Sequence, residues 1–376
     1  MSTALGIVGG GQLARMTALD AARLGVDVRV LAGPSDEGVR GVFEVVDGDH
    51  DDLAALRRLA EQVDVVTFDH ELVPLDVVRA LEADGVVVRP GSPALAFADK
   101  VHQRRAFLAA GLPLPAFDVV ADLPGVEAFA ATHGWPVVLK APHGGYDGRG
   151  VAIAGSPAEA RDMVEASAGR GVLVEAHLDL QAELAVLVVT SADGSRVVYD
   201  PVRSVQVDGM CREVHAVAGH LPPILAAEAG DLGREVADLV GAVGVLAIEL
   251  FVVAAPDGTQ RLVVNEIAPR PHNSGHHTID GCATSQFENH ARAVLGWPLG
   301  PVTPRATASV MVNVVGTAGD PRDRVHLVDP AVKIHLYDKS PRPGRKIGHV
   351  TAVGTDHDET AAAARRAAAV LEGEQP

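Results

Sequence analysis

The chain has 376 residues, of which 47% are hydrophobic, and its formal net charge is -17 at pH 7. This length predicts two or three domains with buried cores. The acidic excess argues against nucleic-acid and membrane partners, because both surfaces are themselves negatively charged. No apolar run approaches the ~18 residues of a membrane span, and the start lacks a secretory leader pattern, so we expect a cytoplasmic protein. Cys211 and Cys282 have no metal-like spacing and are expected to be buried thiols.

The first 90 residues alternate between strand-like and helix-like segments. An apolar run, a glycine turn, a helical pattern and a second apolar run predict a βαβ unit over residues 4–33. Further strands are expected at 64–68 and 85–90, with a helix at 51–62. Such alternation predicts a parallel, doubly wound sheet, in a domain that ends near residue 98.

The rest of the chain has a different pattern. Asp99 is a candidate N-cap for a helix that Gly111 and Pro113 would end. Several β-branched strands then follow, with helices at 157–168 and 223–243, which predicts an α+β region rich in antiparallel hairpins. A Gly/Pro-rich stretch at 296–304 predicts a boundary, and the last unit ends in an alanine-rich helix expected to be solvated. The expected domains are 1–98, 99–297 and 298–376.

The first glycine turn contains G-x-G-x-x-A at Gly9, Gly11 and Ala14, a pattern typical of dinucleotide dehydrogenases. In those enzymes the second strand ends in an acid that binds the ribose, whereas this strand ends in residues 31–33, Leu-Ala-Gly. A nicotinamide cofactor is therefore disfavoured. The backbone N–H groups at the start of the helix could still bind a phosphate or another polar group.

A second glycine-rich stretch, HGGYDGRGV at 143–151, follows Lys140 at the end of an apolar strand. One ammonium group and several backbone donors suit a nucleotide triphosphate. The stretch is not a Walker A loop, and its glycines suggest a mobile flap over phosphates. The alternative is a flexible hairpin without a ligand.

Two acids lie within apolar, strand-like runs: Glu249 in IELF, and Glu266 in VVNEIAPR next to Asn265. A buried, unpaired carboxylate is costly, so a partner is expected. Magnesium, held by carboxylates, an amide and nucleotide phosphates, fits this need. The alternative is that both acids lie at strand edges and face water.

The next stretch, APRPHNSGHHT, contains Arg270, His272 and Asn273, which suit a small oxyanion beside Mg-ATP. Zinc binding by His272, His276 and His277 is disfavoured, because no cysteine or carboxylate completes a known spacing. Further on, the basic stretch KIHLYDKSPRPGRKIGH at 333–349 contains a single acid. It could bind an anion or be a solvated basic turn.

Five stretches, GGGQLARM, GGYDGRG, NEIAPRPHNSGHHT, SQFENH and YDKSPRPGRKIGH, resemble in order and spacing the motifs of the 5-(carboxyamino)imidazole ribonucleotide synthase family of the ATP-grasp superfamily. The resemblance covers nearly the whole chain. It implies an α/β and α+β architecture, with a Rossmann-like N-terminal domain, an ATP-grasp domain whose flap subdomain spans about 118–178, and a small C-terminal domain. It also implies a homodimer.

The activity implied by the resemblance is ATP-dependent carboxylation of aminoimidazole ribonucleotide by bicarbonate through carboxyphosphate, in purine biosynthesis. The cofactor would be Mg²⁺ or Mn²⁺, without biotin. Carboxyphosphate hydrolyses readily, so a flap that excludes water and a cationic site that positions both anions suit this chemistry.

The resemblance also implies roles for individual residues. The ATP-binding set is Lys100, Lys140, Gly145, Tyr146, Asp147, Gly148, Arg149, Gly150, Val151, Glu175, Ala176, His177, Leu178, Glu183, Gln206, Asn265 and Glu266. The metal ligands are Glu249 and Glu266, and the catalytic set is Arg270, His272, Asn273 and Asp147. The ribonucleotide-binding set is Gln12, Leu13, Glu71, Tyr146, Arg149, Lys339, Arg345 and Lys346.

Three parts of the sequence depart from the family pattern. Residues 175–178 read EAHL where many members have EKFV, so that only main-chain contacts carry over. Gln206 replaces a histidine of some relatives, and Asp69 is shorter than the expected glutamate. Asp69 is therefore a weaker candidate than Glu71 for a contact near the imidazole.

Competing functions remain open at this point. A formate-dependent glycinamide ribonucleotide transformylase, or another ATP-grasp ligase, would share the glycine loop, although the string around His272 argues against it. A biotin carboxylase is disfavoured because no M-K-M carrier motif is present. A nucleotide-binding regulatory module without turnover is disfavoured by intact Glu249, Glu266 and Arg270.

Overall fold

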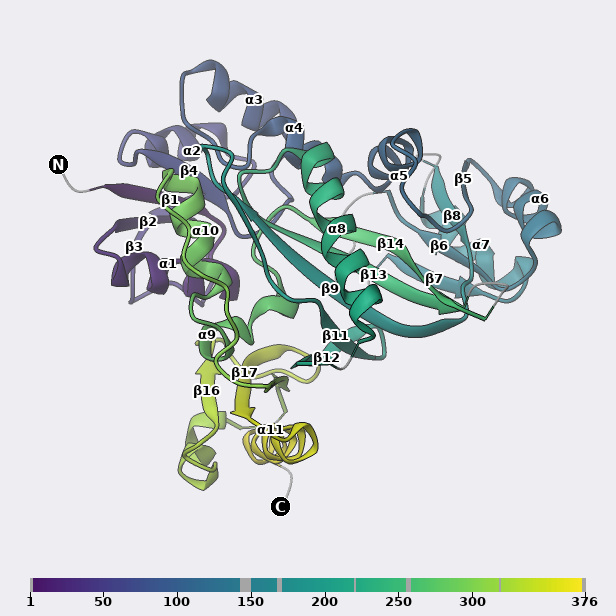
Figure 1. The fold of residues 1–376 in the computed structure, drawn as a ribbon. Coiled ribbons are helices and arrows are strands. Elements are labelled where there is room, and N and C mark those ends of the chain that lie inside the picture. The colour runs from purple at the N-terminus through teal and green to yellow at the C-terminus, as the bar shows by residue number, and fades with distance from the viewer. Residues whose placement is uncertain are drawn as a thin grey trace.

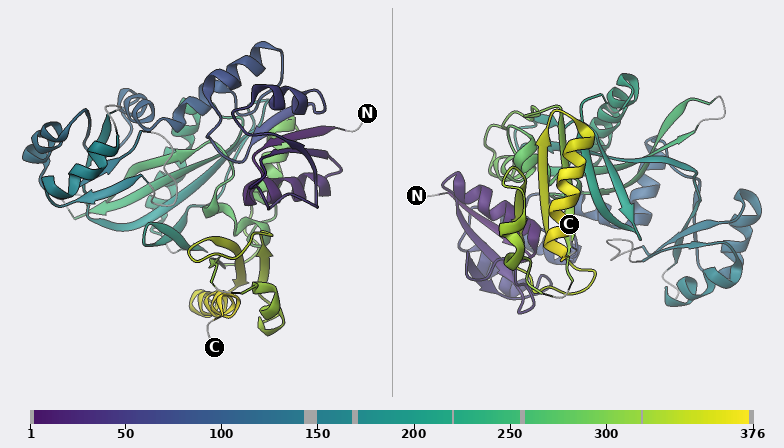
Figure 2. Two further views of the ribbon diagram at one scale, coloured as in Figure 1. Left: turned by 180° about the vertical axis from the view of Figure 1, so that it is seen from behind. Right: turned by 90° about the horizontal axis from the view of Figure 1, so that it is seen from below.

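The computed structural model describes residues 3–142, 150–167, 171–219, 221–254, 258–317 and 319–373. Within these ranges the strands form a four-stranded sheet near the N-terminus, a second four-stranded sheet and a nine-stranded sheet (Figure 1). Seen from below, the second four-stranded sheet and its helices stand apart from the rest of the molecule (Figure 2).

The N-terminal sheet is parallel, in the order β3-β2-β1-β4, as the alternating pattern predicts. Its elements are β1 (Ala4–Val8), α1 (Gln12–Arg23), β2 (Asp27–Ala32), β3 (Glu44–Asp47), α2 (Leu53–Ala60), β4 (Val65–Phe68) and α3 (Leu75–Ala83). Strands β1, β2 and β4 bury most of their side chains, because helices cover both faces of such a sheet, whereas the edge strand β3 has only exposed and half-buried residues.

The strand expected at 85–90 does not form, and this prediction is wrong. Only Val88 pairs with β4, through one isolated bridge to Val66. Val66 donates to the Val87 carbonyl and accepts from Arg89, each at 2.9 Å. Pro90 has no N–H group to continue the ladder, so the pairing stops there.

Helix α5 (Lys100–Ala109) begins where the sequence predicts. The Asp99 side chain accepts hydrogen bonds from the backbone N–H groups of Val101 and His102. Gly111, with φ of +77°, lies just beyond the end of the helix. Two short helices, α4 (Ser92–Leu95) and η1 (Ala96–Ala98), precede it.

The second four-stranded sheet has the order β5-β8-β6-β7, with every pair antiparallel. Its elements are β5 (Phe117–Val120), α6 (Leu123–His133), β6 (Val137–Lys140), β7 (Val151–Ala154), α7 (Pro157–Ala166) and β8 (Val172–Ala176). Lys140 ends β6, and the stretch 143–149 that follows it lies outside the described residues.

The nine-stranded sheet is antiparallel and confirms the expected hairpin-rich region. It comprises β9 (Leu180–Thr190), β10 (Arg196–Val198), β11 (Val202–Val207), β12 (Met210–Val217), β13 (Gly244–Ala254), β14 (Gln260–Ala268), β15 (Ala308–Val315), β16 (Lys333–Leu336) and β17 (Lys346–Gly354). Because β12 pairs with β15, the sheet continues across the domain boundary expected near residue 298.

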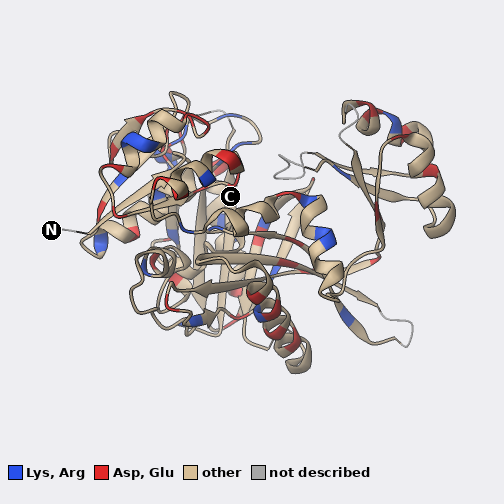
Figure 3. Ribbon diagram, turned by 90° about the horizontal axis from the view of Figure 1, so that it is seen from above, with Lys and Arg blue, Asp and Glu red and all other residues tan. Residues whose placement is uncertain are grey.

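Helix α8 (Pro223–Val240) covers one face of this sheet. It buries Leu225, Leu232 and Val236 in a core shared with β9 and β13. Its opposite face exposes a row of acids at helical spacing (Figure 3). These are Glu228, Asp231, Glu235 and Asp238.

The C-terminal helix α11 (His357–Glu372) is not the solvated helix that its composition suggests. Ala361, Ala364 and Ala367 lie in one core with Val312 and Val350 of the sheet. Small side chains let a helix approach a sheet closely, so the alanines form a packing face. The other short elements are η2 (Asn273–Gly275), α9 (Thr278–Gly281), α10 (Gln286–Leu295) and η3 (Pro321–Leu327).

Neither cysteine forms a disulfide with the other: Cys282 is buried as expected, whereas Cys211 is only half-buried. In the described part of the chain, every helix is too short or too polar to cross a membrane.

Candidate functional site

A cavity of about 1130 Å³ is lined by residues from the N-terminal region, the small antiparallel sheet, the large sheet and the C-terminal region. Many of the site residues predicted from the sequence line this cavity, namely Gln12, Leu13, Glu71, Lys100, Lys140, Val151, Glu175, Ala176, His177, Leu178, Glu183, Gln206, Glu249, Asn265, Glu266, Arg270, His272, Asn273 and Lys346. Residues far apart in sequence thus meet around one space that is large enough for two substrates.

Some predicted site residues do not line this cavity. Among the described ones, these are Gly150, Lys339 and Arg345. The predictions for Gly145, Tyr146, Asp147, Gly148 and Arg149 lie outside the described residues. Asp69, the weaker candidate, does line the cavity.

Glu249 and Glu266 face each other across the β13–β14 pair. The register shifts beside them, since Leu250 pairs with Val264 and leaves Asn265 as an extra residue in β14. A bulge of this kind turns a side chain that would otherwise point to the other face. As a result Asn265 and Glu266, although adjacent in sequence, both line the cavity.

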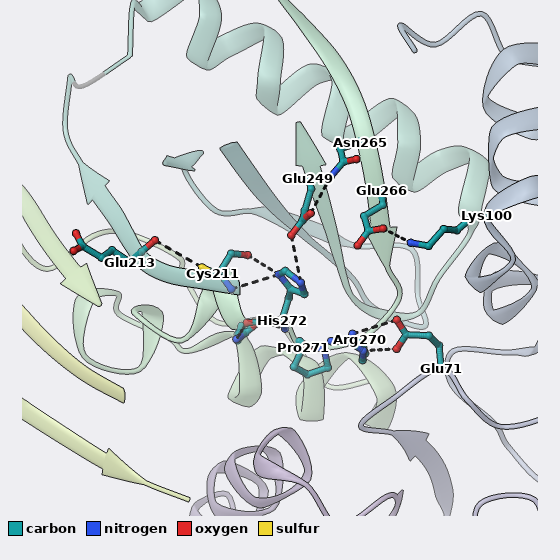
Figure 4. A network of polar contacts seen from close by, with 12 residues as sticks. Glu71, Lys100, Cys211, Glu213, Glu249, Asn265, Glu266, Arg270, Pro271 and His272 are labelled. Atoms are coloured by element: carbon teal, nitrogen blue, oxygen red, sulfur yellow. Dashed lines mark hydrogen bonds and ion pairs between the residues drawn. The ribbon is translucent and has the colours of Figure 1, made fainter. Parts of the chain in front are cut away.

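Asn265 links these acids to a lysine. Its amide Nδ2 donates to Glu249 Oε2 at 3.2 Å, and its Oδ1 accepts from Lys140 Nζ at 2.9 Å. Lys100 donates to the Glu266 carboxylate (Figure 4). Two carboxylates, an amide and two ammonium groups therefore share one end of the cavity, which we call the acidic-pair end.

The two acids of this pair differ in protonation. Burial raises the pKa of Glu249 to about 8, with further contributions from Glu266 and Glu183. Burial also acts on Glu266, but Lys100 and Lys140 outweigh it and lower the pKa. A second full negative charge is thus unfavourable at this end unless a cation is added.

The donor set fits magnesium. Within the described ranges, no group of three or more His, Cys, Asp or Glu side chains could hold a metal ion. Glu249, Glu266 and the Asn265 amide supply hard oxygen atoms, and Mg²⁺ commonly takes its remaining ligands from phosphates and water.

Arg104, which the sequence analysis did not identify, organises the neighbouring side chains. Its guanidinium donates to the Glu175 carboxylate and to the Asn265 carbonyl. Glu175 also pairs with Lys140 at 2.8 Å. Burial would raise the pKa of Glu175, but Arg104 and Lys140 lower it to about 2. Arg104 lies one helical turn after Lys100, so an i, i+4 comparison could have placed both on one face of α5.

At the opposite wall, Arg270 binds Glu71 through two nitrogen atoms, with its Nη2 at 3.2 Å from Glu71 Oε1 (Figure 4). Burial alone would lower the pKa of Arg270, but Glu71 raises it. The guanidinium therefore stays positively charged, and its two hydrogen bonds to the Glu71 carboxylate fix the orientation of its plane.

His272 lies between the two walls. Its Nε2 is 3.6 Å from Glu249 Oε1, and its Nδ1 is 2.9 Å from the Ser274 hydroxyl. Burial, followed by the charge of Arg270, lowers the pKa of His272 to about 4, so the imidazole is neutral at neutral pH. Gln286 binds the His272 backbone through both amide atoms, at 2.9 and 2.7 Å. Gln286 belongs to the SQFENH motif but is not among the site residues predicted from the sequence.

The basic C-terminal stretch reaches the N-terminal region beside the cavity. Lys339 donates to the Gln12 side-chain oxygen, and Arg345 pairs with Glu37 at 3.0 Å. Burial, followed by the charge of Arg345, lowers the pKa of Lys339 to about 8. Lys346 lines the cavity directly. We call this the basic-stretch end of the cavity; Glu37 was not predicted from sequence.

The first glycine turn is partly occupied by the chain itself. The Gly11 N–H group, at the start of α1, donates to Asp69 Oδ2 at 2.8 Å. Asp69 is buried, and burial raises its pKa. The phosphate considered for this turn would therefore meet a carboxylate at an N–H group that is already paired. The acidic-pair end is the better phosphate site because Lys100 and Lys140 supply positive charge there.

Three family models match the chain. The ribonucleotide synthetase preATP-grasp domain matches residues 1–99, the ATP-grasp domain matches residues 105–287, and the phosphoribosylaminoimidazole carboxylase C-terminal domain matches residues 309–363. They follow one another in the order expected from the motifs.

Relatives along the whole chain support the same grouping. The N5-carboxyaminoimidazole ribonucleotide synthase of Mycobacterium tuberculosis is 47% identical over 361 residues, which is 93% of this chain and 83% of the relative. The carboxyaminoimidazole ribonucleotide synthase of Aspergillus clavatus, solved with ATP, aligns with a TM-score of 0.89 at 30% identity and covers 100% of this chain and 99% of the other. Its complex with ADP and 5-aminoimidazole ribonucleotide gives a TM-score of 0.86 at 29% identity, over 99% of each chain.

Proposed function

The chain belongs to the family of N5-carboxyaminoimidazole ribonucleotide synthases, and from this premise we propose how its residues share the work of the reaction. It is an ATP-grasp ligase that carboxylates 5-aminoimidazole ribonucleotide in an ATP-dependent step of purine biosynthesis. The nicotinamide, formate and regulatory alternatives are therefore set aside.

ATP is proposed to bind along the small antiparallel sheet, with its phosphates at the acidic-pair end. Lys100 and Lys140 would neutralise phosphate charge, and the backbone of residues 175–178 together with Glu183 would hold adenosine. The support is that all of these residues line the same cavity. The proposed flap over the phosphates includes Gly145, Tyr146, Gly148, Gly150 and Val151. Gln206 is proposed to contact the nucleoside.

Magnesium, or manganese, is proposed to be held by Glu249, Glu266 and Asn265. Such an ion would neutralise charge that develops between the β- and γ-phosphates during phosphoryl transfer. Its binding would also favour the deprotonated form of Glu249, whose pKa burial raises to about 8. No biotin is required in this scheme.

Bicarbonate is proposed to lie between Arg270, His272 and Asn273. A bicarbonate oxygen would attack the γ-phosphorus of ATP, forming a C–O–P linkage as the bond to ADP breaks. Arg270, fixed by Glu71 with an Nη2–Oε1 distance of 3.2 Å, would hold the two anions close together. Neutral His272 would donate or accept a hydrogen bond without adding charge.

The amine of the ribonucleotide would then attack the carboxyl carbon, either of carboxyphosphate itself or of CO2 released from it, so that a C–N bond forms and phosphate leaves. Lys346, together with Lys339 and Arg345 beside the cavity, would bind the ribonucleotide phosphate. Gln12, Leu13 and Glu71 would line its sugar and imidazole. Tyr146, Asp147 and Arg149 are proposed to face the same substrate, although they lie outside the described residues.

The domain bounds, the location in the cell and the oligomeric state remain proposals. The domains would be 1–98, 99–297 with a flap subdomain at about 118–178, and 298–376. The protein would be a cytoplasmic homodimer, which sedimentation at several concentrations would test.

The observation that carries these assignments is the acidic pair, with Glu249 opposite Glu266 on β13 and β14 in the cavity that also contains Lys100, Lys140 and Arg270. Substituting Glu266→Gln should lower kcat for ADP formation roughly 100- to 1000-fold, because an electrostatic contact in the transition state is lost. ADP release would be measured with ATP, bicarbonate and aminoimidazole ribonucleotide, and with each omitted.

The matched control is Glu127→Gln, an exposed acid on α6, which should leave kcat unchanged. Full activity of the Glu266→Gln variant would refute the metal assignment while leaving the family membership intact.

A further inference from the structure

A second cavity, of about 450 Å³, shares no lining residue with the first. Its walls come from the loop after β10, the end of β12, the start of α8, α9 and the segment before β15. A volume of this size is typical of small-molecule sites. The proposed reaction makes no use of it.

Two buried side chains in its wall lack hydrogen-bond partners. His277 is 3% exposed, and neither of its ring nitrogens is paired. Ser309 is 4% exposed, and its hydroxyl is unpaired as well. Buried polar groups are nearly always paired in native proteins, and an unpaired one is costly. A neutral imidazole has one donor and one acceptor nitrogen, so its natural partner both accepts and donates.

These unpaired atoms converge on one place. A Cβ atom at Gly281 would lie 2.5 Å from Ser309 Oγ and 3.5 Å from His277 Nδ1. Ser309 therefore occupies the space that a side chain at residue 281 would fill, and His277 Nδ1 lies close to the same point. The lining contains Gly281, His277 and Ser309 together.

Apart from Asp200, the titratable side chains of the described lining are uncharged at neutral pH. Burial lowers the pKa of His277 to about 4 and raises that of the Cys282 thiol to about 12. No lysine or arginine is found among the lining residues that the structure describes, and Asp200 is the acid among them. An anion would lose its hydration here without a counter-ion, which is strongly unfavourable.

The remaining wall is largely apolar, with Pro201, Leu221, Val302 and Pro304 among its residues. Water molecules filling such a space would find few polar partners beyond His277 and Ser309. Replacing poorly held water by an apolar ring is favourable, provided that the ring also satisfies the two polar groups.

We propose that this second cavity binds a small, uncharged heterocycle that carries one hydrogen-bond donor and one acceptor, held by His277 and Ser309. The inference goes beyond the proposed reaction and does not depend on it. The site lies at the far end of the short stretch, residues 272–282, whose beginning borders the first cavity.

The test uses indazole, an uncharged bicyclic molecule with adjacent N–H and N atoms, and saturating ADP to fill the nucleotide site. Binding to the full chain would be measured by isothermal titration, and crystals of the ADP complex would be soaked with indazole. We expect density for the ring beside His277, with binding weakened at least fivefold by Ser309→Ala and at least fivefold by His277→Phe.

Benzoate, a flat anion of similar width, is the charged comparator and should bind at least tenfold more weakly than indazole. Cooperative thermal unfolding of each variant would confirm that it folds, and the soak of the unmodified protein tests the proposal even if both variants fail to fold. Absence of indazole from this cavity, equal binding by the folded variants, or benzoate binding as tight as that of indazole would overturn the proposal.

Discussion

The two ends of the large cavity are built in different ways. At the acidic-pair end, Asn265 contacts Glu249 across one hairpin, and the two residues are 16 positions apart in sequence. At the basic-stretch end, Lys339 contacts Gln12 from 327 positions away, and Arg345 contacts Glu37 from 308 positions away. The carboxylates and the amide of the first end are fixed by local register, although Lys100 and Lys140 reach them from 166 and 125 positions away. The second end depends on how the terminal regions pack together.

This difference predicts different consequences of mutation. Changes at the acidic-pair end should affect folding stability and kcat, because buried charges there contact one another inside a paired sheet. Changes at the basic-stretch end should act chiefly on KM for the ribonucleotide, because those cations are proposed to contact a part of the substrate that does not react.

The largest effect is expected for Arg104→Met. The substitution leaves Glu175 buried with Lys140 alone, and breaking a buried ion pair typically costs about 3–5 kcal/mol. Urea denaturation at pH 7 would measure the loss. Arg105→Met, at the exposed neighbouring position, is the control and should change stability little. Equal stability of the two variants would contradict the role given to Arg104.

The pH dependence of unfolding should reflect the same pair. The pKa of Glu175 falls from 4.5 to about 2 on folding. Its contribution to the free energy of unfolding is therefore complete above pH 4.5 and is lost as the pH falls toward 2. That loss amounts to roughly 3 kcal/mol when converted from the shift. Denaturation at several pH values should show a weaker acid dependence in Arg104→Met. An unchanged profile in that variant would remove the pair as the cause.

Arg270→Lys tests the contact between Arg270 and Glu71. Lysine keeps the charge but loses the forked contact with Glu71, so bicarbonate should be held less well for attack on ATP. We expect kcat to fall about 10- to 100-fold, with little change in KM for ATP. Steady-state ADP formation would measure both, with Arg105→Lys as control. A change in KM for ATP alone would place Arg270 at the nucleotide instead.

The smallest effect is expected for Lys339→Met. Removing one phosphate contact should raise KM for aminoimidazole ribonucleotide about tenfold and leave kcat nearly unchanged. Arg322→Met, an exposed cation of the same region, is the control. A fall in kcat at saturating ribonucleotide would show that the basic-stretch end takes part in the chemistry and would erase the contrast between the two ends.

The acidic-pair end could largely be predicted from sequence, because Glu249, Asn265 and Glu266 each lie in an apolar strand-like run. The bulge that turns the side chains of Asn265 and Glu266 toward one cavity could not be predicted, since the register of β14 depends on its pairing with β13. Arg104 and Glu37 could not be assigned for a related reason, since their partners Glu175 and Arg345 lie 71 and 308 positions away in sequence. The i, i+4 spacing from Lys100 marks the helix face of Arg104 but not its partner, and no local pattern marks Glu37.

The fold shows the same limits. The βαβ start and the Asp99 cap follow from local patterns and are confirmed. Residues 85–90 are apolar enough for a strand, yet Pro90 ends the pairing after one bridge. The alanine-rich helix α11 was expected to be solvated, because alanine has little hydrophobic surface; packing against the valines of β15 and β17 buries it.

The most direct test is a crystal structure of the protein with Mg²⁺ and a non-hydrolysable ATP analogue. The metal should lie about 2.0–2.1 Å from oxygen atoms of both Glu249 and Glu266, with the triphosphate against Lys100 and Lys140. A triphosphate bound at the first glycine turn beside Asp69, or a metal that contacts neither glutamate, would contradict this account.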